Sequence, residues 1–198
     1  MIARLLYAAL LEMRRCRVSR WAHSRDAERF IQPGGWEPEV TEAILRGDWQ
    51  GPVWDVGANV GKIAHRIAEK FDVIAFEPGL NSLYYLGWNT RHLPRVTVVP
   101  CALTLDGAPM RVSCDPDFFL EPEGPRAMTI SVDDAVAKFG RPGLVKIDIE
   151  GGEYELIKAP AFQRVPLLIE WHRGIPDALP HWTIERVDDS HSLLLPKV

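Results

Sequence analysis

A glycine-rich segment, Asp55-Val-Gly57-Ala-Asn59-Val-Gly61, stands between a short apolar run and a helical pattern. Glycine permits a tight turn and a close approach of the backbone to a ligand, and free N–H groups at a helix start can receive an anionic group. The spacing differs from the G-x-G-x-x-G of dinucleotide-binding loops. It suits a ligand that ends in a methionine-like carboxylate and amine, with Asp55 as the acceptor for the ammonium. The alternative is an ordinary strand-to-helix turn.

Glu77 follows the next apolar run, 22 residues after Asp55, and Pro78 comes directly after it. An acid at the tip of the strand beside a glycine loop can accept hydrogen bonds from both ribose hydroxyls of a nucleoside. We therefore predict that Glu77 and Pro78 lie in a nucleoside site. A solvated acid at a strand end is the alternative.

The segment Lys146-Ile-Asp148-Ile-Glu150-Gly-Gly-Glu153 gathers acids at the end of a further strand. Alternation along a strand places Lys146, Asp148 and Glu150 on one side of the chain. In doubly wound sheets ligands bind where the strands end. The acids can orient a substrate hydroxyl, act as a general base, or hold a divalent cation such as Mg²⁺. The alternative is that they only cap the next helix or pair with Lys146.

Glu170-Trp-His172 ends a fifth strand, and His172 is a candidate proton acceptor because histidine titrates near neutral pH. A structural role at the strand end is the alternative. The remaining histidines show no metal-ligand spacing, and we interpret them as ordinary: His23, His65, His92, His181 and His191.

The cysteines are odd in number and form no C-x-x-C motif, which indicates reduced thiols in a cytoplasmic protein rather than a disulfide scaffold or a zinc site. Cys101 and Ala102 follow the third strand, where we expect them to line the adenine of a nucleoside. The nucleophilic cysteine of a cytosine C5 methylase follows the fourth strand, so Cys101 is not expected to have that role. The cysteines are Cys16, Cys101 and Cys114.

Apolar β-rich runs alternate with helical patterns from residue 53 on, which predicts an α/β fold with a mostly parallel sheet. We expect a doubly wound, Rossmann-like sheet of seven strands with helices on both faces, the last two strands forming an antiparallel pair at its edge. The strand at 96–99 is β-branched almost throughout, so we expect it to be buried on both faces. The expected strands are 53–56, 73–76, 96–99, 144–147, 167–169, 182–187 and 193–198, the expected helices are 63–70, 82–89, 131–139 and 153–158, and 115–125 is expected to be a surface loop.

Residues 1–50 do not follow this rhythm, and we interpret them as a helical extension or lid on a domain that spans 51–198. The apolar run Ile2–Leu11 is too short to span a membrane, which takes about 20 apolar residues. It lacks the charge order of a secretory signal, because its arginines come after the apolar residues. We expect an amphipathic helix packed on the domain, with peripheral membrane or partner contact as alternatives. The arginines that follow are Arg14, Arg15, Arg17 and Arg20.

The motifs together resemble those of FkbM-type methyltransferases. The resemblance implies a class I methyltransferase fold, S-adenosylmethionine (SAM) as cofactor, and O-methylation of sugar or natural-product hydroxyls. By position it also implies that the glycine loop contacts the methionine part, that Glu77 binds the ribose, and that Asp148 and Glu150 face the reacting centre. The short tail and the first 50 residues depart from the family pattern and leave the acceptor open. The matching stretches are WDVGANVGKIA (54–64), IAFEPGLNSLYYLGWN (74–89), VVPCAL (98–103), ISVDD (130–134), LVKIDIEGGEYELIKA (144–159) and LLIEWH (167–172).

We therefore expect direct transfer of a methyl group to a small-molecule or glycan hydroxyl, with Asp148, Glu150 or His172 as the base or with Mg²⁺ at Asp148 and Glu150. One rival is an RNA or protein methyltransferase that grips its substrate through the arginine-rich start. The net charge of −4 argues against broad nucleic-acid binding, and the fourth strand lacks the N/D-P-P-Y/F motif of amino-methylating enzymes. Other rivals are a non-catalytic SAM-binding module and, disfavoured by the loop spacing, a nicotinamide-dependent oxidoreductase.

Overall fold

The computed structural model describes residues 37–112 and 125–197. Several predictions from the sequence lie outside these residues: the apolar run 2–11, the arginines that follow it, Cys16, His23, Cys114 and the loop 115–124. Within the described ranges, no helix has both the length and the apolar character needed to cross a membrane.

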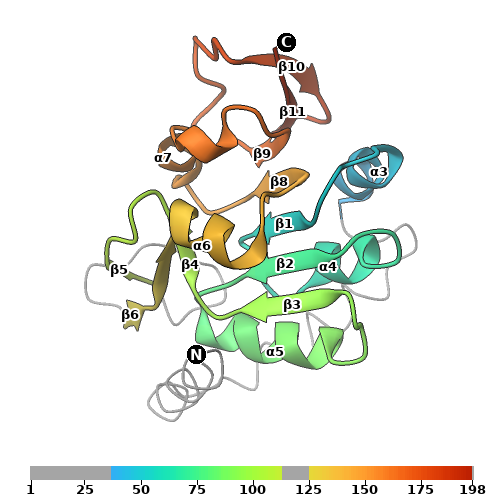
Figure 1. Ribbon diagram of the computed structural model, residues 1–198, viewed down its shortest axis with the longest axis vertical. Coiled ribbons are helices and arrows are strands. Elements are labelled where there is room, and N and C mark those ends of the chain that lie inside the picture. Colours follow the sequence, from blue (N-terminus) through green and yellow to red (C-terminus); the bar gives the residue numbers. More distant parts are fainter. Residues whose placement is uncertain (1–36, 113–124, 198) are drawn as a thin grey trace.

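A seven-stranded sheet with the order β10-β11-β9-β8-β1-β2-β3 forms the centre of the molecule (Figure 1). Neighbouring strands pair in parallel except at β11, which is antiparallel to both β9 and β10. The predictions of a mostly parallel seven-stranded sheet and of an antiparallel pair at its edge are confirmed. The strands are β1 (Val53–Val56), β2 (Val73–Phe76), β3 (Val96–Val99), β8 (Leu144–Ile147), β9 (Leu167–Glu170), β10 (Trp182–Arg186) and β11 (His191–Pro196).

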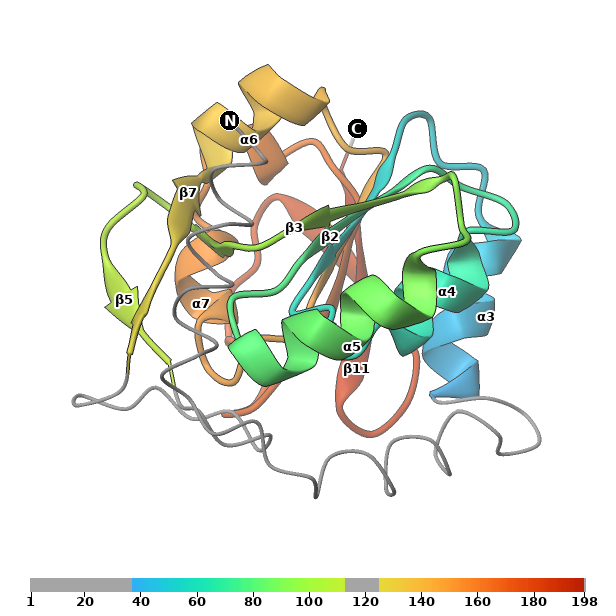
Figure 2. The same ribbon diagram turned by 90° about the horizontal axis from the view of Figure 1, so that it is seen from below.

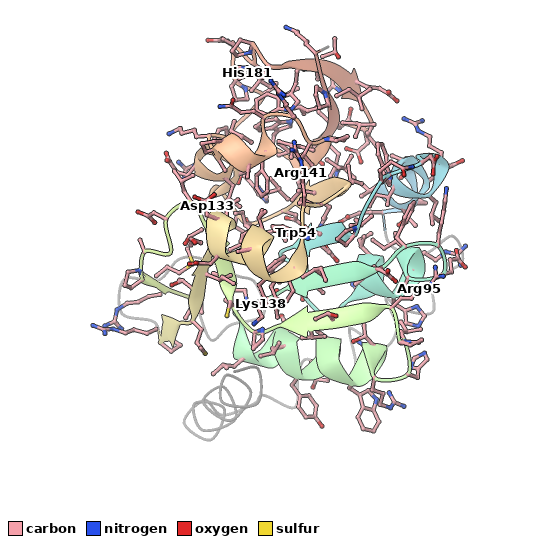
Figure 3. The ribbon with its side chains drawn as sticks, in the orientation of Figure 1. Trp54, Arg95, Asp133, Lys138, Arg141 and His181 are labelled. Atoms are coloured by element: carbon pink, nitrogen blue, oxygen red, sulfur yellow. The ribbon has the colours of Figure 1, made fainter. Side chains whose placement is uncertain are left out.

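Helices cover both faces of the sheet, as predicted (Figure 2). Successive strand residues point to opposite faces, so Trp54 belongs to one buried core and Val53 to the other. The Trp54 core includes α6 (Val132–Phe139), α7 (Glu153–Leu156) and the 3-10 helix η1 (Pro160–Phe162), and the Val53 core includes α3 (Pro38–Arg46), α4 (Lys62–Ile67) and α5 (Leu80–Thr90). In Figure 3 Trp54 lies at the centre of the molecule, while Arg95 and His181 lie at its periphery.

Two features of the sheet differ from expectation. β3 is an edge strand, and its Val96, Thr97 and Val98 are only half-buried, so the prediction of burial on both faces is wrong. A β-branched composition indicates that a segment fits a pleated sheet, but it does not indicate whether the strand lies at the centre or at the edge of that sheet. The described residues between β3 and α6, where the sequence predicts no strand, include two small sheets: β4 (Ala102–Thr104) with β7 (Thr129–Ser131), and β5 (Met110–Arg111) with β6 (Arg126–Ala127).

The strand order reverses at β1. From β1 the chain adds β2 and β3 on one side, and then returns to place β8 on the other side of β1. Ligands of open α/β sheets bind at such a switch point, outside the carboxyl ends of the strands. We call this side of the sheet the carboxyl edge. It carries the segments that follow β1, β2, β8 and β9, and the start of the antiparallel β11.

Candidate active site

The glycine loop after β1 is bent by residues with positive φ. Gly57 has a φ of 84°, Asn59 of 49° and Gly61 of 87°. A Cβ on Gly57 would lie 1.8 Å from the carbonyl oxygen of Asp148, and one on Gly61 would lie 2.7 Å from the Leu86 side chain. Packing against backbone therefore requires glycine at 57, whereas at 61 the positive φ is the stronger reason for glycine. At Gly57 the side of the backbone where a Cβ would stand is filled by the protein itself rather than by a ligand.

Asn59 joins this loop to the ends of β2 and α5. Its backbone N–H donates to Glu77 Oε2 at 2.8 Å, and its side-chain Oδ1 accepts from the Ser82 hydroxyl at 3.0 Å. The left-handed backbone of Asn59 thus aims one donor at the acid that was predicted to bind the ribose. The structure brings the glycine loop and Glu77 together.

Glu77 is a buried carboxylate, with 2% of its surface exposed. Burial raises its pKa to about 7, although the N–H groups of Gly79 and Asn59 act in the opposite direction. Gly79 N–H donates to Oε1 at 2.6 Å. Each carboxylate oxygen therefore has one backbone donor and keeps a second lone pair for another donor, such as a hydroxyl.

Pro78, Cys101 and Ala102, also predicted to bind the cofactor, follow the ends of β2 and β3. The Glu77 N–H donates to the Val99 carbonyl at 3.1 Å, so the start of the segment that follows β3 adjoins the end of β2. Cys101 and Ala102 in that segment are buried, and Pro78 is half-buried. Burial raises the pKa of the Cys101 thiol, and a thiol kept protonated is a poor nucleophile.

Lys146 lies between two acids at the switch point. Its Nζ is 2.9 Å from Asp148 Oδ2 and 3.7 Å from Asp55 Oδ1. Burial alone would lower the pKa of Lys146, but Asp148 and Asp55 raise it overall, so the ammonium stays charged. Asp55 is fully buried, and the cation near it is the ammonium group of Lys146.

Asp148 and Glu150 lie after the end of β8, on a turn rather than on the strand. Burial would raise the pKa of Asp148, but Lys146, hydrogen bonds and His172 together lower it. Glu150 has a φ of 53°, and its side chain is 46% exposed. A non-glycine residue held in this conformation costs free energy, and such residues cluster at functional sites.

His172 follows β9 and faces these acids. Its Nε2 lies 3.4 Å from Glu150 Oε2 and 3.8 Å from Asp148 Oδ1. On the other side of the ring, Nδ1 lies 3.4 Å from Glu153 Oε1. The three residues predicted to be catalytic are therefore neighbours.

Glu153 has a role at the site that the sequence did not reveal. It is fully buried, and its carboxylate accepts the His172 N–H at 3.1 Å and the Gly151 N–H at 2.7 Å. It ties the turn after β8 to the end of β9. Its position directly after two glycines at a helix start is a signal that could have indicated this.

Glu170 and His191 are further neighbours without a predicted role. Glu170 hydrogen-bonds Asp148, and burial together with Asp148 raises its pKa to about 8. His191, interpreted from sequence as ordinary, is the cross-strand partner of Glu170 in the sheet. Its Nε2 lies 3.8 Å from Glu170 Oε2 and 3.9 Å from Glu37 Oε2, and its Nδ1 lies 2.8 Å from Asp188 Oδ2.

Three of these side chains could surround a metal ion. Among the described residues, Asp148, Glu170 and His172 offer ligand atoms that all lie within 4.8 Å of one another. Glu150, which the sequence paired with Asp148 for this purpose, does not belong to that group.

Comparison with known proteins supports the assignment that the motifs suggested. A family model described as the methyltransferase FkbM domain matches residues 55–187. The hexuronic acid methyltransferase AglP of Haloferax volcanii is 32% identical over 153 residues, which cover 70% of this chain and 64% of the relative. The crystal structure of the methyltransferase FkbM from Methylobacillus flagellatus KT has a similar fold, with a TM-score of 0.54 and 22% identity over 81% of this chain and 48% of that one. This chain thus spans less than two thirds of the length of both relatives. The chain belongs to the methyltransferase FkbM domain family, a family of SAM-dependent methyltransferases.

Proposed function

We propose that this protein transfers the methyl group of SAM to a hydroxyl group of a sugar or a natural-product-type small molecule. One observation carries the proposal. The Asn59 N–H donates to Glu77 Oε2 at 2.8 Å, so the glycine loop is joined to the glutamate that we expect to bind the ribose. Asp148 packs directly against the same loop at Gly57. A nucleoside cofactor and an acidic acceptor site would then meet at the switch point of the sheet.

The cofactor would be held by the ends of β1, β2 and β3. We propose that Glu77 accepts the two ribose hydroxyls with its remaining lone pairs. Asn59 is exposed and Gly57 half-buried, so these two would contact the methionine part, whereas Asp55 and Gly61 are buried and would shape the loop from within. Pro78, Cys101 and Ala102 would pack against the adenine.

The acceptor proton requires a base, since a protonated alcohol is a weak nucleophile. When bound, SAM supplies a methyl carbon made electrophilic by its sulfonium and leaves as S-adenosylhomocysteine. Asp148 is a weak base because Lys146 stabilises its ionised form. We propose that Glu150, half-exposed and held on a strained turn, takes the hydroxyl proton, and that Asp148 orients the acceptor. His172 Nε2 lies 3.4 Å from Glu150 Oε2 and so adjoins the proposed base.

The sequence also suggested Mg²⁺. The three ligand groups Asp148, Glu170 and His172 fit a divalent cation, because their donor atoms converge and each comes from the carboxyl edge. Such an ion would lower the pKa of the acceptor hydroxyl.

We further propose a sugar acid as the acceptor class. The relative from Haloferax volcanii acts on a hexuronic acid by name. In this chain Arg173 is exposed next to His172, and its guanidinium lies against Gly151, where an added Cβ would be 3.1 Å from Nη2. An arginine there would bind the acceptor carboxylate and leave a hydroxyl free to face Glu150.

Arg173 can be tested with a matched pair of acceptors. Arg173→Ala should lower kcat/KM about fivefold for methyl β-glucuronide and leave methyl β-glucoside unchanged, because an exposed ion pair contributes little free energy. Arg164→Ala, another exposed arginine, is the control. An equal loss on both acceptors would contradict the assignment of Arg173.

The proposed function is tested by calorimetry with S-adenosylhomocysteine, followed by an acceptor screen with labelled SAM. We expect saturable binding and transfer to glycosides, and we expect Asp148→Ala to abolish the transfer. The product should be a methyl ether, which survives mild base. A base-labile methyl ester, or transfer only to RNA or protein, would contradict hydroxyl methylation, and binding without any transfer would indicate a non-catalytic module.

We also propose a cytoplasmic location. The support is the odd number of cysteines without a C-x-x-C motif, together with the free, buried thiol of Cys101.

A further inference from the structure

We infer that Asp148, Glu170 and His172 form a binding site for a divalent transition metal such as Mn²⁺. The inference deepens the proposed function, because it names the cation of the same acceptor site. It differs from the expectation for Mg²⁺ at Asp148 and Glu150 both in the ligands and in the kind of metal.

The distances from the imidazole to the two acids suit one shared ion better than direct hydrogen bonds, and an ion would take the place of the proton that Glu170 shares with Asp148. His172 Nε2 lies 3.8 Å from Asp148 Oδ1 and 4.0 Å from Glu170 Oε2. Both separations exceed hydrogen-bond length. Two atoms bound to one ion at about 2.1 Å lie at most about 4.2 Å apart, so both separations remain within reach of a shared ion.

Asp148 is oriented by a partner on its far side, and His172 has an acid beside its second ring nitrogen. Lys146 Nζ binds Asp148 Oδ2 at 2.9 Å, which leaves Oδ1 to face the imidazole. The Glu153 carboxylate lies 3.4 Å from His172 Nδ1, which has no hydrogen bond among the described residues, and Nε2 faces Glu150 as well as Asp148 and Glu170. Metal-binding histidines commonly have such a carboxylate at the second ring nitrogen, since it fixes the ring and makes the ligand more basic.

His191 supplies an independent observation. Its side chain is only 4% exposed, and among the described residues its Nε2 has no hydrogen-bond partner. Asp188 holds the ring through Nδ1, and the unpartnered Nε2 is directed at Glu170 Oε2, 3.8 Å away. A buried polar atom without a partner is costly, and an ion-bound water beside Glu170 would provide one.

The charge around the three donors also favours a cation. Several carboxylates gather around the three donors, and Lys146 contacts two of them, Asp148 and Asp55. A divalent ion would offset their repulsion. The carboxylates are Asp55, Asp148, Glu150, Glu153 and Glu170, with Glu37 beside His191.

The donor set selects the class of metal. Mg²⁺ prefers oxygen ligands in octahedral geometry, whereas imidazole suits first-row transition metals. Two carboxylates with one imidazole therefore favour Mn²⁺ or a similar ion over Mg²⁺.

The test is electron paramagnetic resonance of Mn²⁺ added to the full-length protein, a measurement that does not depend on activity. We expect one bound ion per chain, with a nitrogen modulation from a coordinated imidazole. His172→Gln should remove that modulation, and Glu170→Gln and Asp148→Asn should each weaken binding about tenfold or more. Glu155→Gln, an exposed acid on α7, is the matched control and should change nothing. Thermal melts of all four variants confirm that each is folded.

Other outcomes would overturn the inference. A free Mn²⁺ signal in the presence of excess folded protein would do so, as would bound Mn²⁺ without nitrogen modulation or with equal affinity in all variants. If S-adenosylhomocysteine binds and methyl transfer survives chelation while Mn²⁺ stays free, the metal site fails and the proposed function stands. If S-adenosylhomocysteine does not bind, the proposed function itself fails.

Discussion

Glu77 and Glu170 are both acids at the carboxyl edge, but different contacts hold them. Glu77, on the cofactor side, receives the backbone N–H groups of Gly79 and Asn59. Glu170, on the acceptor side, meets the side chains of Asp148, His172 and His191. Backbone donors are fixed by the path of the chain, whereas side chains can rearrange when a ligand or an ion arrives.

The two sides also differ in how fully their polar atoms are satisfied. On the acceptor side, His172 Nδ1, His191 Nε2 and Glu37 Oε2 are buried without a hydrogen bond in the described part of the chain. On the cofactor side both oxygens of Glu77 have donors, whereas both oxygens of Asp55, beneath the glycine loop, lack a hydrogen bond among the described residues. The ribose position at Glu77 is thus prepared in advance, and the acceptor side is the one that binding should complete. Substitutions should therefore separate cofactor binding from methyl transfer.

Glu150→Gln should lower turnover strongly and act on the acceptor side alone. Loss of a general base lowers kcat by about 10²- to 10⁴-fold. Because Glu150 is half-exposed and its ion-pair partner is His172 on the acceptor side, the affinity for S-adenosylhomocysteine should stay within about twofold. Turnover assays and calorimetry measure the two quantities. If the affinity for S-adenosylhomocysteine fell together with kcat, the cofactor side and the acceptor side would not be independent.

Gly57→Ala should damage both sides, because Gly57 lies where they join. Its new Cβ would lie 1.8 Å from the Asp148 carbonyl oxygen, and its φ of 84° is strained for alanine. We expect the free energy of unfolding to fall by about 3–4 kcal/mol. Gly174→Ala is the matched control, since its φ is also 84° but no atom lies within 4 Å of the added Cβ. That variant should lose only about 1–2 kcal/mol. Equal losses in chemical denaturation would show that the contact between loop and Asp148 is not tight.

Glu77→Ala should weaken cofactor binding and spare the acceptor side. The lost hydrogen bonds to a charged acceptor correspond to about 1.5–3 kcal/mol, or about 10- to 100-fold in the affinity for S-adenosylhomocysteine. At saturating SAM, kcat should change much less than this. Calorimetry and saturation kinetics test the pair, and an unchanged affinity would remove Glu77 from the ribose site.

The pH dependence of binding gives a smaller but specific signal. The pKa of Glu77 is raised to about 7, and ribose hydroxyls would donate to its ionised form. Binding then competes with protonation, so affinity should rise by up to about tenfold per pH unit as the pH increases toward 7, and level off above it. Glu77→Gln should show a weaker but flat profile over the same range. A rise that persists in the glutamine variant would assign the titration to another group.

The cofactor side was largely predictable from local sequence. The strands at 53–56, 73–76, 96–99 and 144–147 have their predicted bounds, because short apolar runs end at residues that stop a strand. Glu77 and the glycine loop follow consecutive parallel strands, so their proximity follows from topology alone. The packing at Gly57 and Gly61 could not be predicted from local sequence, since it depends on the Asp148 carbonyl and the Leu86 side chain.

Sequence by itself determined which acids and glycines follow the parallel strands, since patterning and chain order place those residues at one edge. Only the tertiary structure decided that His191 faces Glu170, because that contact depends on the antiparallel register of β11 against β9, which hydrophobic alternation does not specify between distant segments. It also decided that Glu37 adjoins the acceptor side and that β3 lies at the edge of the sheet. Contacts between segments far apart in the chain arise from the packing of whole elements, and no local spacing encodes them.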